Sequence, residues 1–172
     1  MRIIQVCSSR NQLRGGAEQF CLTLSKSLTL SGHNVTLVTG NGSVADLNDL
    51  PYQCIRIPEV MAIAPRKLAF DYVNPFAVYE FKNIINDIRP DLIHFHSFYG
   101  ISSFLLRLAK TKYPTVVTLH DSWIFFYDSS MILPNFEVTN SAWKLPLGHL
   151  HRKINQNFFR GSTLVSPSMW MK

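Results

Sequence analysis

Two histidine-containing motifs follow short apolar runs in this sequence, so each could place a titratable group at the end of a buried strand. His120 and Asp121 come directly after residues 115–119, a run rich in β-branched side chains. His96 and Ser97 follow a second apolar run. In open parallel α/β sheets, ligands bind in the crevice outside the carboxyl ends of the strands. We therefore expect both histidines at one edge of a sheet, where they could bind a ligand or take part in catalysis.

The histidine spacing also raises the question of a metal centre. His-x-His beside His-Asp could coordinate a metal ion, but no further carboxylate ligand is evident, and we expect no metal. A nucleophilic triad is not indicated, because the sequence has no G-x-S-x-G. We interpret His94, inside the predicted strand, as a packed core histidine and His33 as structural.

A third feature is the adjacent glycine pair Gly15 and Gly16, in the loop before the first predicted helix. Amides at a helix N-terminus can bind an anion such as phosphate, and Arg10 and Arg14 lie nearby in the sequence. A flexible turn that leads into the helix explains the same residues equally well. G-x-G-x-x-G, a Walker lysine and an acidic residue after the second strand are all missing, which argues against a Rossmann dehydrogenase.

The elements that must position these residues alternate between strand and helix. The expected strands are 2–7, 34–39, 52–57, 92–95, 115–119 and 162–165, and the expected helices are about 17–28, 75–88, 101–109 and 147–159. Asn74 and Pro75 are typical of a helix cap and first turn. This alternation predicts the α/β class, a doubly wound Rossmann-like parallel sheet with helices on both faces.

Two details of this prediction concern individual segments. The apolar face expected for the first helix consists of Ala17, Phe20, Cys21, Leu24 and Leu28. The proline-punctuated stretch before Asn74 shows no clear element, and the polar and aromatic stretch 122–141 lacks a clean period.

Length and composition limit the classes of protein that this chain can belong to. With 172 residues, 47% of them hydrophobic and 16% charged, it can form one globular domain with a sizeable core. Its apolar runs are far shorter than the roughly 20 residues that span a bilayer. Since no signal peptide is evident, we expect a cytoplasmic protein. Cys7, Cys21 and Cys54 are widely spaced among apolar residues and are expected to be free thiols.

The net charge of +6 favours anionic partners. No arginine-rich tract or other nucleic-acid motif is present, so we do not expect a nucleic-acid partner. Basic and aromatic side chains gather between residues 143 and 160. This mixture could form a peripheral contact with a membrane or simply be a solvated helix face.

Four segments taken in order resemble the N-terminal half of the retaining family-4 glycosyltransferases with the GT-B fold. They are RGGAEQFCLTLSKSLTLSGHNVTLVT, RPDLIHFHSFYG, PTVVTLHDSW and TLVSPSMWMK. The resemblance covers nearly the whole chain, although 122–159 matches weakly, and S-P-S-x-W is similar to members that build bacterial polysaccharides. It implies that residues 1–172 form the acceptor-side domain, that a C-terminal nucleotide-sugar domain is absent from this chain, and that the chain alone is inactive.

The resemblance also implies roles for particular residues. Gly16 would present its amide to the diphosphate of the donor, and Gly15 would let the loop approach closely. His120 would contact the donor sugar near the reacting carbon, with Asp121 helping to fix the turn. The acceptor side would be lined by His96, Ser97, Phe98 and Tyr99.

The activity implied is transfer of a sugar, of hexosyltransferase type, from a nucleotide-sugar to a glycan or lipid-linked acceptor. No metal or other cofactor is expected, and the location implied is the cytoplasm or the inner face of the membrane. Two alternatives stay open. One is a non-catalytic α/β module that binds a phosphorylated ligand in the same crevice, and the other is a two-domain sugar epimerase.

Overall fold

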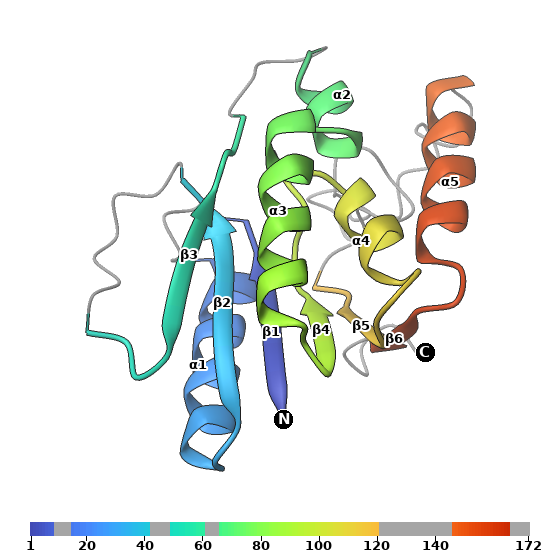
Figure 1. The fold of residues 1–172 in the computed structure, drawn as a ribbon. Helices are drawn as coiled ribbons and strands as arrows, with labels where there is room; N and C mark the ends of the chain where they lie inside the picture. The colour runs from blue at the N-terminus through green and yellow to red at the C-terminus, as the bar shows by residue number, and fades with distance from the viewer. Residues whose placement is uncertain (9–14, 42–48, 61–65, 121–145, 166–172) are drawn as a thin grey trace, which may run out of the picture.

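The computed structural model describes residues 1–8, 15–41, 49–60, 66–120 and 146–165. Within these ranges six parallel strands form one sheet in the order β3-β2-β1-β4-β5-β6. The strands are β1 (Arg2–Cys7), β2 (Asn34–Gly40), β3 (Gln53–Ile57), β4 (Leu92–Phe95), β5 (Thr115–Thr118) and β6 (Thr163–Val165). The chain moves outward from β1 in one direction and from β4 in the other (Figure 1). The point where the strand order reverses, between β1 and β4, is where such sheets bind ligands.

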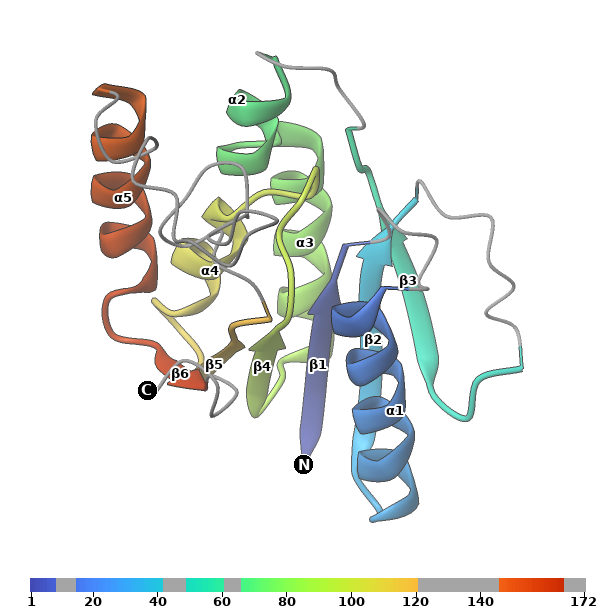
Figure 2. The ribbon, with the colours of Figure 1, turned by 180° about the vertical axis from the view of Figure 1, so that it is seen from behind.

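Helices cover both faces of this sheet, which confirms the predicted fold class. The helices are α1 (Gly16–Leu30), α2 (Arg66–Tyr72), α3 (Pro75–Ile88), α4 (Phe104–Ala109) and α5 (Pro146–Phe159). α1 lies on one face, whereas α3, α4 and α5 lie on the other (Figures 1 and 2). α2 falls in the proline-punctuated stretch for which no element was predicted. With seven residues it is too short for a helical period to stand out in the sequence.

The larger core lies between the sheet and the helices α3 and α4. Its fully buried side chains include Ile4, Phe81, Ile85, Ile93, Phe95, Ile101, Leu105 and Leu106. A smaller core under α1 consists of Cys7, Cys21, Val35, Leu37 and Tyr52. All three cysteines are free thiols, as predicted.

The buried face of α1 differs from the predicted one. Glu18, Cys21 and Ser25 are the buried residues of this helix, whereas Phe20 is 48% exposed. The Ser25 hydroxyl is satisfied within the helix, because it donates to the Cys21 carbonyl at 2.8 Å. Polar residues with an internal partner can therefore face the sheet, and the large ring of Phe20 lies at the margin of the helix, beside the site described below.

The predicted caps of α3 are confirmed. The Asn74 side chain accepts a hydrogen bond from the Ala77 amide at 3.3 Å, and Pro75 is the first helical residue. The helix ends at Arg89, which adopts the left-handed conformation with φ 49°.

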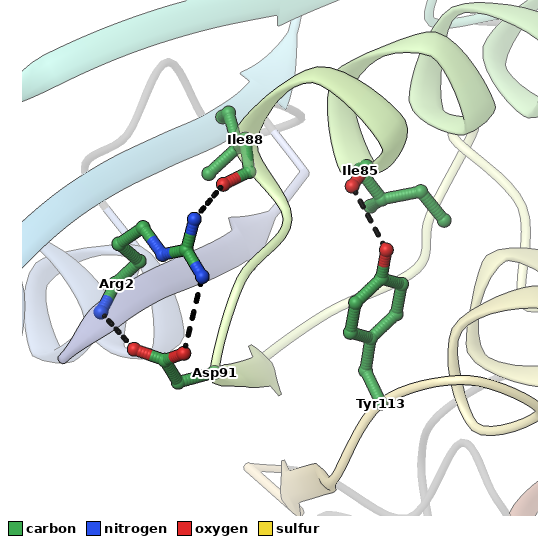
Figure 3. Close-up of polar contacts among 5 residues, drawn as sticks. All are labelled: Arg2, Ile85, Ile88, Asp91 and Tyr113. Atoms are coloured by element: carbon green, nitrogen blue, oxygen red, sulfur yellow. Dashed lines mark hydrogen bonds and ion pairs between the residues drawn. The ribbon is translucent and has the colours of Figure 1, made fainter.

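The edge formed by the amino ends of the strands is here called the amino edge. Hydrogen bonds and an ion pair connect the residues of this edge to one another and to α3 (Figure 3). The Arg2 amide donates to Asp91 Oδ2 at 2.7 Å, and the Arg2 guanidinium lies 3.4 Å from Oδ1. The same guanidinium donates to the Ile88 carbonyl, and the Tyr113 hydroxyl donates to the Ile85 carbonyl at 3.1 Å. These contacts fasten the end of α3 to the sheet.

Candidate functional site

The structure brings the predicted histidines together at the opposite edge, here called the carboxyl edge. His96 directly follows β4 and His120 follows β5, and their facing nitrogens, Nδ1 and Nε2, are 3.2 Å apart. Gly16 begins α1, which the chain enters from the carboxyl end of β1. Phe20 of α1 contacts both imidazoles, with ring centroids 5.8 Å from His96 and 5.3 Å from His120. The predicted shared edge is therefore confirmed, whereas Asp121 lies outside the described residues.

The N-terminus of α1 lies at this edge. Gly15 is the N-cap, with φ −72° and ψ 164°, and it has no side chain with which to cap the first turn. The amides of that turn have no acceptor within the helix. A Cβ added at Gly16 would meet no atom of the described residues within 4 Å. Glu18, in the same turn, is buried. Binding of an anion by Gly15 and Gly16 stays a prediction, and Arg10 and Arg14 lie outside the described residues.

The residues that follow His96 form a mostly buried floor. The Ser97 hydroxyl accepts a hydrogen bond from the Ser8 amide at 2.9 Å and lies 2.8 Å from the Ser8 hydroxyl, which ties β4 to β1. Phe98 belongs to the larger core and packs against Phe95 and Phe159. Tyr99 is half-buried. That these residues line an acceptor site stays a prediction.

The turn that ends this segment is held by the junction of α2 and α3. Asp71 accepts a hydrogen bond from the Gly100 amide at 2.6 Å, and Asn74 donates to the Gly100 carbonyl at 2.9 Å and to the Pro58 carbonyl at 3.0 Å. Gly100 has φ +70°, and a Cβ there would lie 2.9 Å from the Val60 carbonyl oxygen. A glycine is therefore required at this position, and the turn fixes where the preceding residues lie.

His96 and His94 are kept neutral by their surroundings. Burial, together with smaller contributions from repulsion by His94 and His120, lowers the pKa of His96 to about 2. Burial likewise lowers the pKa of His94 to about 4, with a contribution from His120. His94 fits its interpretation as a packed histidine, because its Nε2 lies 2.8 Å from the Thr118 hydroxyl and its ring centroid lies 4.1 Å from that of His96, at an interplanar angle of 40°.

Two residues of the site were missed by sequence reasoning. Gln5 is fully buried in β1, and its Oε1 lies 2.7 Å from His96 Nε2. The signal was present, because Gln5 is the one amide in the apolar strand RIIQVC. Phe20 was predicted to pack under the helix, whereas it borders both histidines.

Among the described residues, no group of three or more histidine, cysteine, aspartate or glutamate side chains is arranged to hold a metal ion. Within the same ranges, none of the helices is both long and apolar enough to cross a bilayer.

A doubly wound parallel sheet with polar groups at its switch point defines a Rossmann-like ligand-binding domain. The family described as Glycosyltransferase Family 4 matches residues 14–172, and this chain belongs to that family. The family predicted from the four sequence segments is thereby confirmed. No curated protein matches the sequence.

Solved glycosyltransferases share the fold. Sucrose-phosphate synthase (tll1590) from Thermosynechococcus elongatus is similar over 94% of this chain, with a TM-score of 0.64 and 16% identity. The spinosyn forosaminyltransferase SpnP is similar over 100% of the chain, with a TM-score of 0.58 and 16% identity. A glycosyltransferase from Rickettsia africae ESF-5 is similar over 96%, with a TM-score of 0.55 and 19% identity.

This chain spans 41% of the sucrose-phosphate synthase, 48% of SpnP and 36% of the Rickettsia africae protein. At these identities the similarity shows the fold, which is the Rossmann-like domain of a GT-B glycosyltransferase.

Proposed function

We propose that this chain is the acceptor-side domain of a retaining glycosyltransferase. The enzyme would transfer a sugar, as a hexosyltransferase, from a nucleotide-sugar to a glycan or lipid-linked acceptor in polysaccharide biosynthesis. One observation carries the proposal: the N-terminus of α1, which has no side-chain cap at Gly15, and the His96–His120 pair meet at the switch-point edge of a family-4 domain, and Phe20 contacts both histidines.

The chemistry of retaining transfer fits the two halves of this site. The leaving diphosphate needs positive or dipolar partners, which the first-turn amides beside Gly16 can supply. The sugar develops positive charge at the reacting carbon, so a neutral polar group such as His120 can stabilise it, whereas a charged one would oppose it. Asp121 would help to fix the turn that carries His120.

The acceptor would lie over the segment His96 to Tyr99. Since His96, Ser97 and Phe98 are all buried, their part in this role is to hold the floor, and direct contact falls to Tyr99. The tie between Ser97 and Ser8 keeps this floor next to β1 and hence next to α1. Acceptor and donor would thus meet at one edge.

The rest of the donor would be held by a second domain. Because the chain spans less than half of each similar structure described above, the base, the ribose and most of the diphosphate would bind outside it. The chain alone would then be inactive. We place the enzyme in the cytoplasm, with a peripheral contact at the inner membrane face, and assign it no metal or other cofactor.

Binding and transfer measurements test this function together. Calorimetry of the 172-residue chain with UDP-, GDP- and ADP-sugars should show no micromolar binding, and the full-length protein should transfer sugar. Micromolar binding to the chain alone, about −8 kcal/mol, without transfer by the full-length protein would instead favour a non-catalytic module for a phosphorylated ligand.

Gly16→Val in the full-length protein examines the diphosphate half of the site. It should raise the donor KM, because the new side chain enters the space that the ligand needs. The fold should persist, since that space is empty of described atoms and valine in a helix costs at most about 1 kcal/mol. An unchanged donor KM would contradict the role given to Gly16.

A further inference from the structure

We infer that Gln5 and His96 are positioning residues that fix the tautomer of His120, with its proton on Nε2 and its lone pair on Nδ1. The hydrogen-bond chain that carries this inference runs from Gln5 through His96 to His120. Its meaning for catalysis rests on the proposed function, but the proton positions themselves can be tested without any activity.

The first link of the chain sets the proton on His96. Gln5 Oε1 is a carbonyl oxygen and can only accept a hydrogen bond, so His96 must donate from Nε2 across 2.7 Å. Both side chains are buried, with His96 only 4% exposed, so water cannot readily replace this partner.

The second link follows because a neutral imidazole carries only one ring N–H proton. Burial keeps this imidazole neutral, and its proton is already on Nε2. Its Nδ1 is therefore a bare acceptor. His120 Nε2, at 3.2 Å from that nitrogen, must be the donor. A neutral His120 then carries its lone pair on Nδ1.

The surrounding sheet holds the chain in this arrangement. Gln5 is opposite His94 in the register of β1 with β4, and the His96 amide donates to the Val6 carbonyl at 2.9 Å. The ring of His94 packs against His96 in a tilted arrangement, and His94 is hydrogen-bonded to Thr118. The ring of His96 is thus oriented by its own backbone, by the neighbouring ring of His94 and by the Gln5 carbonyl.

The tautomer matters because the two ring nitrogens of His120 face different partners. Nε2 faces His96, so under the proposed function Nδ1 is the nitrogen that His120 would turn toward the donor sugar. A lone pair there attracts the positive charge that develops on the donor sugar, whereas an N–H dipole would repel it. Gln5 would therefore influence the transfer rate through His96 without touching the substrate.

Long-range ¹H–¹⁵N NMR spectra of the labelled chain at neutral pH test the proton positions directly, because protonated and bare ring nitrogens have distinct shifts. Wild-type spectra should show His96 and His120 both protonated on Nε2 and bare on Nδ1. A proton on Nδ1 of either ring would overturn the inference. It would mean that the Gln5 side-chain amide is turned so that its nitrogen faces His96, or that the hydrogen bonds between these side chains have the opposite direction.

Gln5→Met keeps most of the side-chain volume but removes the carbonyl acceptor. In this variant His120 should populate both tautomers, whereas Thr118→Val, which removes the partner of His94 on the same face, should leave the His120 tautomer unchanged. Unchanged His120 spectra in Gln5→Met would refute the positioning role.

The full-length protein separates this inference from the proposed function. Gln5→Met should lower kcat roughly two- to tenfold, in proportion to the loss of the competent tautomer, with both KM values unchanged. Tautomers as predicted, combined with full activity in His120→Ala, would support the hydrogen-bond chain and overturn the catalytic role of His120.

Discussion

At the amino edge, oppositely charged side chains form a pair near solvent. At the carboxyl edge, chemically similar side chains lie together away from solvent. Arg2 and Asp91 are half-exposed and complementary, and the pKa of the Asp91 carboxyl is lowered first by the hydrogen bond from the Arg2 amide and then by its guanidinium. At the carboxyl edge, the described neighbours of His96 are two more histidines, a glutamine and an aromatic ring. The polar groups of the amino edge are paired within the chain, and the carboxyl edge has the arrangement expected where a ligand completes the interactions.

Buried polar atoms without a hydrogen-bond partner add to the difference between the two edges. Gln5 Nε2 and Thr39 Oγ1 both lack a hydrogen bond within the described part of the chain, and both lie on the face and toward the edge that carry the histidines. Such atoms cost about 1–3 kcal/mol each. Proteins usually retain costs of this kind where function requires them.

The largest change in stability is expected where the carboxyl edge is held rigid. Asp71→Ala should lower the free energy of unfolding by about 3 kcal/mol, because the buried Gly100 amide loses its charged acceptor. Asp71→Asn is the matched control, since its carbonyl oxygen can still accept. Urea denaturation of both variants measures the difference. An equal loss in both would mean that the negative charge, and not the hydrogen bond, matters.

Acid should weaken the carboxyl edge before the amino edge. His96 has an ordinary pKa of 6.5 in the unfolded chain and about 2 in the folded one, so between these values only the unfolded chain binds the proton. Stability should therefore fall as the pH falls below 6.5, by about 1.4 kcal/mol per pH unit. His94 contributes in the same direction, down to about pH 4. Asp91 loses its contribution only as the pH falls below its ordinary 3.8, through its lowered pKa.

Urea midpoints at pH 7, 6 and 5 test this order, with His96→Gln as the comparison. The variant should show a flatter dependence of stability on pH. A wild-type stability that stays constant over this range would mean that His96 is protonated in the folded protein.

A smaller effect of opposite sign is expected at Thr39. Thr39→Val removes a buried hydroxyl that has no partner among the described residues and keeps the shape of the side chain. The free energy of unfolding should rise by about 1 kcal/mol. Chemical denaturation measures it, and a loss of stability would show that the hydroxyl is satisfied.

The smallest effect is expected at the amino edge. Arg2→Ala should lower the melting temperature slightly, and the difference should shrink at high salt, because the ion pair with Asp91 is solvent-exposed. A double-mutant cycle with Asp91→Asn isolates the pair. A large coupling that is insensitive to salt would contradict the contrast between the two edges.

The strands and the shared edge could be predicted because the information is local. Apolar, β-branched runs mark the buried strands, and a histidine directly after each of two such runs must lie at the carboxyl edge of a parallel sheet. The Asn74–Pro75 cap was equally local. Each of these confirmed predictions depends on residues that are close together in the sequence.

The remaining features depend on packing that a single segment does not encode. Gln5 meets His96 across 91 residues, and only the register of β1 with β4 brings them together. The face of α1 was misassigned at Phe20 because apolarity alone cannot choose between adjacent helical faces when Ser25 satisfies its own hydroxyl. Asp121 lies outside the described residues, so its role stays a prediction.

The most direct test of the account is the rate of sugar transfer by the full-length protein with His120→Ala. His33→Ala is the matched control, since His33 lies between α1 and the amino end of β2. We expect His120→Ala to slow transfer by roughly 100-fold, the lower range for loss of one polar catalytic group. Acceptor binding should stay near wild type, and the melting temperature should fall only slightly, because His96 Nδ1 loses one hydrogen-bond partner. His33→Ala should transfer normally. Wild-type turnover in His120→Ala would show that this histidine is structural and would contradict the central claim.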